Sequence, residues 1–169
     1  MAEGTLRAPG DKVEYCADRM RTRAAWRWAN VPLPEPHLVG LGAGLLLQLV
    51  APWRLPWPVW VGRAVGALLL LAGLALAAWA VRVAAEVGLA RPGRLVRRGP
   101  YAFSRNPMYV AATAVYTGIA LVASAAWPLL LLPAVLLATH LVVIREERSL
   151  EARFGAGYRS YEASVRRYL

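Results

Sequence analysis

The sequence predicts an all-α integral membrane protein: a bundle of about four transmembrane helices followed by a C-terminal amphipathic helix on the cytoplasmic side. Three observations support this prediction. Hydrophobic residues make up 58% of the 169 residues, and they are gathered in long runs between short polar segments. The 20 Lys and Arg residues outnumber the 10 Asp and Glu residues. They flank the apolar runs instead of forming one face of a polar domain, which argues against nucleic-acid binding.

Residues 1–36 are expected to form a cytoplasmic tail that ends in an interfacial segment. Trp26 and Trp28 follow a run of arginines, and tryptophan is favoured at headgroup depth. No cleavable signal peptide is expected, because the first apolar run begins only near Leu38. Cys16 is the only cysteine, so it predicts neither an internal disulfide nor a metal site.

Residues 37–169 are expected to form one membrane domain with spans at about 38–53, 60–83, 107–125 and 127–144. A bilayer core needs roughly 20 helical residues, so the first span is short. The apolar stretch from 108 to 144 is too long for one span and divides at a hairpin around 125–128. Small residues predict close helix packing within the first two spans; they are Gly40, Gly42, Gly44, Gly62 and Gly66.

The placement of the basic residues predicts the orientation. Only Arg54 and Arg63 flank the two short loops, which leaves 18 of the 20 in the tail, the central loop and the C-terminal segment. The positive-inside rule therefore places both termini and the central loop in the cytoplasm, and we expect the plasma membrane of a bacterium.

The C-terminal segment, residues 145–169, has an apolar stripe of helical period, formed by Leu150, Phe154, Tyr158, Tyr161 and Val165. This stripe predicts an amphipathic helix that lies on the membrane surface or packs under the bundle. Gly155 and Gly157 are expected to break or bend it near its middle.

The junction between the central loop and the third span has the features of an anion site. Asn106 suits an N-cap whose side chain accepts a backbone N–H, and Pro107 suits the first helical position. Arg98 and Arg105 flank this helix start, where the unpaired donors and the helix dipole favour an anion. The alternative is that the junction only begins a transmembrane helix.

Polar residues at membrane depth are candidates for function. His140 lies in the fourth span and is followed by Glu146 and Glu147. A spacing of seven residues puts His140 and Glu147 on nearly the same helix face, so both are candidate catalytic residues. The alternatives are a histidine bonded to a neighbouring helix and a solvated acidic stop at the interface.

Several short motifs occur in a fixed order: Leu95-Val96, the run 99–101, the run 105–109, Glu146-Glu147 and Phe154-Gly155. This set resembles the membrane methyltransferases related to isoprenylcysteine carboxyl methyltransferase and phospholipid methyltransferase, in particular their small bacterial branch. The resemblance implies that S-adenosylmethionine is the methyl donor, bound on the cytoplasmic side. It also implies a hydrophobic or amphiphilic acceptor, such as a lipid, that enters from the bilayer.

The resemblance also implies roles for individual residues. Leu95, Val96 and Tyr101 would line the cofactor; Asn106, Pro107 and Tyr109 would hold it at the helix start; and Glu146 would contact it from the fourth helix. The chain departs from the prenylcysteine enzymes at two positions, with Asn106 in place of their His and Val142 in place of their substrate-contacting Arg. These departures argue against prenylcysteine as the acceptor.

The chemistry of the donor agrees with these residues. Glu146 or Glu147 can pair with its ammonium group, and Arg98, Arg105 or the helix start can hold its carboxylate. An aromatic face of Tyr101 or Tyr109 suits adenine or the sulfonium. An acceptor hydroxyl or amine needs a base, and His140 or Glu147 is a candidate. Two alternatives are a membrane reductase that uses NADPH and a non-catalytic small membrane protein.

Overall fold

The computed structural model describes residues 34–85 and 95–169, and all of them belong to one compact unit, Leu33–Leu169. The predicted N-terminal tail therefore lies almost wholly outside the described residues. The described part is all-helical, as predicted, and its elements in chain order are α2 (Glu35–Val50), α3 (Val59–Ala85), the 3-10 helix η2 (Gly99–Ala102), α4 (Pro107–Val122), α5 (Ala126–Phe154) and α6 (Ala156–Ser164).

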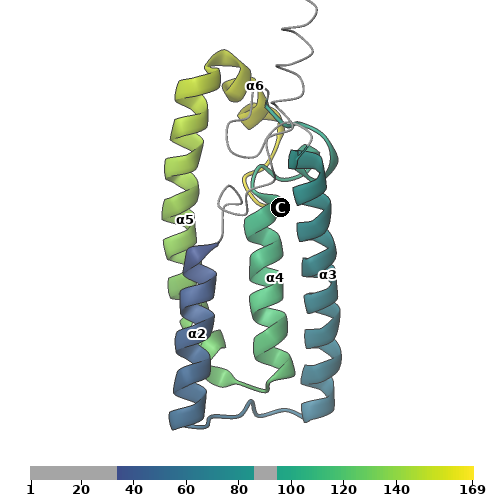
Figure 1. Ribbon diagram of the computed structural model, residues 1–169, viewed down its shortest axis with the longest axis vertical. Coiled ribbons are helices and arrows are strands. Elements are labelled where there is room, and N and C mark those ends of the chain that lie inside the picture. Colours follow the sequence, from purple (N-terminus) through teal and green to yellow (C-terminus); the bar gives the residue numbers. More distant parts are fainter. Residues whose placement is uncertain (1–33, 86–94) are drawn as a thin grey trace, which may run out of the picture. The chain divides into compact units, whose positions relative to one another are not determined.

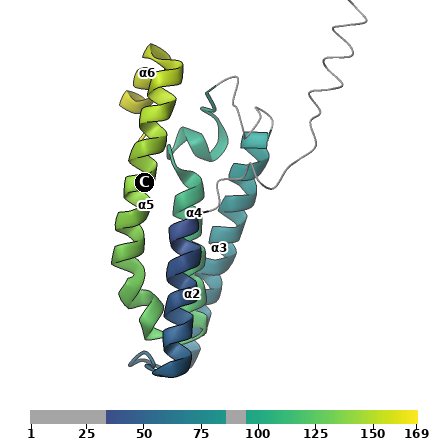
Figure 2. The same ribbon diagram turned by 60° about the vertical axis from the view of Figure 1, so that its left-hand side comes forward.

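Helices α2 to α5 run side by side with alternating direction (Figures 1 and 2). One end of this bundle holds η2, α6 and the C-terminus, and we call it the polar end (Figure 1). The other end holds the two short connections, α2 to α3 and α4 to α5, and we call it the loop end (Figure 1). Residues separated by a whole helix in the sequence therefore meet at the same end.

Two helices of the described part are long and apolar enough to cross a membrane, α3 and α5. Only 17% and 22% of the residues in their most apolar stretches are buried, which is unlike the core helix of a soluble protein. Large apolar side chains instead face outward along the bundle, for example Leu49 (80% exposed) and Leu68 (69% exposed). An outer surface of this kind is stable in a bilayer and not in water.

The fourth helix continues beyond the predicted span of 127–144. Helix α5 does not stop at residue 144 but continues for ten residues to Phe154. The added segment is rich in Arg and Glu, which favour helix, and α5 ends where Gly155 adopts a φ of 52°. The predicted helix over 145–169 is thus the end of α5 followed by the nine residues of α6, with the break at Gly155 as predicted.

Glycines bring the helix backbones into contact. A Cβ on Gly66 of α3 would lie 2.8 Å from the carbonyl oxygen of Gly118 in α4, and one on Gly44 of α2 would lie 2.7 Å from Pro128 Cα in α5. The predicted packing roles of Gly40, Gly44, Gly62 and Gly66 are confirmed. The prediction that Gly42 packs closely is wrong, because a Cβ there would meet nothing within 4 Å.

Candidate functional site

The side chain of Asn106 does not cap α4, although Asn106 occupies the N-cap position. Its Nδ2 group instead donates hydrogen bonds to Glu147 Oε1 (3.2 Å) and to the carbonyl of Arg167 (3.1 Å). The backbone N–H groups of Tyr109 and Val110 both donate to the Asn106 carbonyl. The helix start therefore offers fewer donors to an anion than predicted, because Pro107 has no N–H and the N–H groups of Tyr109 and Val110 already donate to the Asn106 carbonyl.

Glu147 is the centre of this cluster, and its residue is only 7% exposed. Its Oε2 accepts from Arg167, at 3.0 Å from Nε and 2.9 Å from a terminal guanidinium nitrogen. Arg105 adds a second cation, with its Nε 3.6 Å from Oε1. A buried carboxylate needs such partners to offset the loss of hydration.

Arg105 connects the start of α4 to α6. Its guanidinium donates to Glu162 Oε1 at 2.5 Å. Burial alone would lower the pKa of Arg105, but the hydrogen bond to Glu162 and the charge of Glu147 outweigh burial and raise it. Arg105 is therefore a permanent cation shared between two carboxylates.

Glu146 differs from its neighbour because it has no cationic partner among the described residues. Its Oε1 accepts one hydrogen bond, from the hydroxyl of Tyr109 at 2.9 Å. The cluster thus contains three carboxylates, Glu146, Glu147 and Glu162, against two guanidinium groups. Glu146 is the carboxylate without a guanidinium partner, and burial raises its pKa, so a cation bound beside it would favour its charged form.

Residues 165–169, which alone are called the C-terminal segment from here on, pass beside the start of α4 and along α5. The carbonyl of Arg166 accepts from the backbone N–H of Arg105 at 2.9 Å, and the hydroxyl of Tyr168 lies 3.0 Å from His140 Nδ1. This segment therefore links His140 to the Asn106–Glu147 pair. Sequence reasoning missed Arg167 and Tyr168, because a basic C-terminus was interpreted only as a topology signal.

The remaining predicted site residues take no part in the ion pairs of this cluster. Tyr101 is in η2, and its carbonyl accepts from the Tyr161 hydroxyl at 2.7 Å. Burial raises the pKa of Tyr101 to about 12, so its phenol stays neutral at physiological pH. Pro107 is fully buried, and Leu95 and Val96 are half-buried in the segment that leads into η2.

His37 is a second polar centre that sequence reasoning overlooked. It is 3% exposed, and its ring nitrogens lie 2.9 Å from Thr113 Oγ1 and 3.4 Å from Thr139 Oγ1. Three helices, α2, α4 and α5, meet at these side chains. The one sequence signal for His37 was its position directly before the first apolar run. The functional interpretation was given instead to His140, which lies inside a predicted span and is only half-buried.

The model of the phospholipid methyltransferase family matches residues 61–157, which is more than half of the chain. The matched range includes the helix start at Asn106 and the Glu146–Glu147 pair, but neither His37 nor the C-terminal segment. No curated protein and no solved structure matches the chain. With its long apolar helices, it is a membrane protein, and it belongs to the phospholipid methyltransferase family.

Proposed function

We propose that the chain uses S-adenosylmethionine to methylate a lipid-like or isoprenoid small molecule at the cytoplasmic face of the membrane. The observation that supports the cofactor is the carboxylate of Glu146, which has no guanidinium partner among the described residues. S-adenosylmethionine carries a sulfonium, an ammonium and a carboxylate, so its net charge is positive. A carboxylate without a guanidinium partner beside the start of α4 complements that charge.

In this proposal α2, α3, α4 and α5 all cross the membrane, and the polar end faces the cytoplasm. Helices α2 and α4 have 16 residues each, or about 24 Å at 1.5 Å per residue, which is short for a core of about 30 Å. Their flanking residues and local thinning of the bilayer would cover the difference. The orientation rests on the basic residues, of which only Arg54 and Arg63 belong to the loop end.

The cofactor, when bound, supplies an electrophilic methyl group. Glu146 would pair with its ammonium group, and Tyr109 would orient that carboxylate through the 2.9 Å hydrogen bond. Arg105 would reach the cofactor carboxylate only by sharing its guanidinium with Glu147 and Glu162. The half-buried Leu95 and Val96, with Pro107 and the ring of Tyr101, would supply the apolar lining.

His140 is a better candidate for a base than Glu147. Both oxygens of Glu147 already accept hydrogen bonds, from Asn106 and from Arg167, so Glu147 holds the C-terminal segment in place. Among the described residues His140 makes one hydrogen-bonding contact, with Tyr168. In the tautomer whose Nδ1–H donates to Tyr168, its Nε2 can accept a proton from an acceptor hydroxyl or ammonium. An acceptor carboxylate would need no base.

A lipid-like acceptor follows from the surfaces around the cluster. The described residues include no domain outside the bundle that could enclose a polar substrate, and the bundle presents apolar side chains to the bilayer. Val142, on α5 one turn before Glu146, is apolar. It gives no charged partner to a free carboxylate of the acceptor, so a methylated group other than a carboxylate is favoured.

Binding of labelled S-adenosylmethionine to the purified protein tests the cofactor. We expect Glu146→Gln to weaken binding by roughly 10- to 100-fold, because a charge-assisted hydrogen bond contributes about 1.5–3 kcal/mol. Glu151→Gln is the matched control, since Glu151 lies on the same helix and its one ion pair within residues 34–85 and 95–169 is with the exposed Arg159. Unchanged affinity in a folded Glu146→Gln variant would remove Glu146 from the site, and binding of NADPH instead would favour a reductase.

A second assay tests the acceptor. The protein is incubated with methyl-labelled S-adenosylmethionine and a total membrane extract, and the products are partitioned between organic solvent and water. Label in the organic phase is the expected result. Label confined to the aqueous phase, with an active protein, would contradict a lipid-like acceptor.

A further inference from the structure

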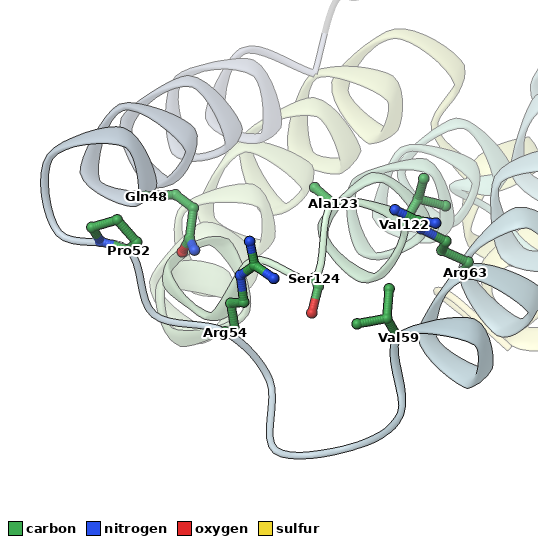
Figure 3. Close-up of a pocket in the computed structure, with 8 residues that line it drawn as sticks. All are labelled: Gln48, Pro52, Arg54, Val59, Arg63, Val122, Ala123 and Ser124. Carbon is green, nitrogen blue, oxygen red and sulfur yellow. The ribbon is translucent and has the colours of Figure 1, made fainter.

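The loop end of the bundle contains a polar recess that the proposed function does not use. The recess has a volume of about 280 Å³. It lies between the α2–α3 connection and the α4–α5 turn, and its polar lining comes from Gln48, Arg54, Arg63 and Ser124 (Figure 3). It is therefore at the opposite end of the bundle from Glu146 and Glu147.

The charge of this recess is not compensated by the protein. Within the described ranges neither Arg54 nor Arg63 makes an ion pair. Every acidic residue in those ranges belongs to the polar end, at the start of α2, along the last turns of α5 or in α6: Glu35, Glu146, Glu147, Glu151 and Glu162. Two guanidinium groups without a carboxylate make the recess attractive to an anion.

Ser124 provides an independent indication of a ligand. The residue is 8% exposed, and its hydroxyl is buried without a hydrogen-bond partner, as is Gln48 Oε1. The Ser124 hydroxyl points to the space between Arg54 and Val59 (Figure 3). A buried polar group without a partner costs about 1–3 kcal/mol, and a ligand that accepts from the hydroxyl removes this cost.

The walls of the recess are held in place by the loop end itself. Arg54 forms an antiparallel bridge with Ala125, the residue after Ser124. The backbone N–H of Ala126 donates to the carbonyl of Trp53 at 3.0 Å, and Trp127 Nε1 donates to the carbonyl of Ala51 at 2.7 Å. The two connections are thus fastened to each other, and the recess is formed before any ligand arrives.

We propose that this recess binds the phosphate group of a phospholipid from the leaflet at the loop end. Guanidinium groups donate paired hydrogen bonds to phosphate oxygens, and the Ser124 hydroxyl adds a third donor. Rotation of the Gln48 side-chain amide by about 180° exchanges its oxygen and nitrogen and would present the NH₂ group to the same anion. Exposed apolar residues of α2 and α3 that are close in sequence to the recess lining, such as Val50 and Trp60, suit acyl chains, which favours a lipid over free phosphate.

Titration of the purified protein with phosphatidylglycerol, followed by native mass spectrometry, tests this site. We expect Arg54→Gln/Arg63→Gln to weaken lipid binding at least about tenfold, and Ser124→Ala to weaken it about three- to tenfold, the effect of one hydrogen bond. Arg148→Gln/Arg153→Gln is the charge-matched control, because both arginines lie near the end of α5 at the polar end, and it should bind lipid like the unmodified protein. Thermal unfolding without lipid verifies that each variant is folded.

The Ser124→Ala variant separates a formed site from general attraction between arginines and headgroups. It keeps both charges and is too small a change to disturb the fold. Lipid binding that is unchanged by Ser124→Ala would overturn the proposal, even if the arginine variant loses binding. Inorganic phosphate that binds as tightly as the lipid would overturn the lipid as occupant. Neither result would bear on S-adenosylmethionine binding at the polar end.

Discussion

The polar end and the α3–α4 interface are both tightly packed, but different parts of the chain hold them together. At the polar end, single side chains far apart in the sequence meet, as those of Arg167 and Asn106 do at the carboxylate of Glu147. At the α3–α4 interface, backbone meets backbone, because Gly66 and Gly118 have no side chains to separate the helices. The first region should therefore be sensitive to loss of one charge, and the second to the gain of one methyl group.

The two regions differ in sensitivity because one buries charged groups and the other buries only uncharged ones. Glu147 is a charge with 7% exposure, and a buried charge without its partner is far more costly than a lost apolar contact. The glycine contacts contain no charge. Their stability comes from van der Waals packing, which is strong only when the two backbones approach closely.

The largest effect is expected from Arg167→Met, which removes the main partner of Glu147 and keeps an unbranched apolar side chain. Breaking a buried ion pair costs about 3–5 kcal/mol. Because the Arg167 side chain is 35% exposed, we expect about 2–4 kcal/mol of lost stability, measured by thermal unfolding in detergent.

The double variant Glu147→Gln/Arg167→Met distinguishes an unpaired charge from lost packing. It removes the buried charge together with its partner, so we expect it to recover at least half of the lost stability. A double variant as unstable as Arg167→Met would show that the segment is held by packing alone.

An intermediate effect is expected from Gly118→Ala at the α3–α4 interface. The new Cβ would lie 2.7 Å from the backbone nitrogen of Leu70 and 2.8 Å from the Gly66 carbonyl oxygen, so the two backbones must separate. Overpacking of this kind costs about 1–3 kcal/mol. Gly42→Ala is the matched control, because its Cβ meets nothing within 4 Å, and equal unfolding temperatures for both variants would contradict close backbone packing.

The smallest effect is expected from Tyr161→Phe at the polar end. This change removes the 2.7 Å hydrogen bond to the Tyr101 carbonyl, while the ring keeps its contact with the guanidinium of Arg97 at 5.7 Å. We expect a loss of about 0.5–1.5 kcal/mol, the contribution of one neutral hydrogen bond. A loss as large as that of Arg167→Met would mean that η2 and α6 detach together.

Much of the fold followed from local pattern. The apolar runs at 60–83 and 107–125 correspond closely to α3 and α4, because run length and helix-breaking residues fix these boundaries. Four of the five glycines predicted to pack closely do so. The end of α5 could not be placed in this way, since a charged segment that continues a helix has the same composition as one that leaves it.

The candidate site was predicted residue by residue but not as a set of pairs. Arg105, Asn106, Tyr109, Glu146 and Glu147 lie together as expected, yet nothing local indicated that Asn106 would turn from its own helix to Glu147. His37 and Tyr168 were missed for the same reason. A side chain's partner 20 or more residues away is set by how the helices pack.

The sequence determined an all-helical membrane protein with a basic and acidic cluster at one end, because apolar run length and charge are local properties of the chain. Only the tertiary structure decided which carboxylate is compensated. Glu146 and Glu147 are adjacent and chemically identical, but consecutive residues on a helix point in directions about 100° apart. Glu147 therefore faces Arg105 and the C-terminal segment, while Glu146 faces Tyr109 and has no guanidinium beside it in the described part of the chain.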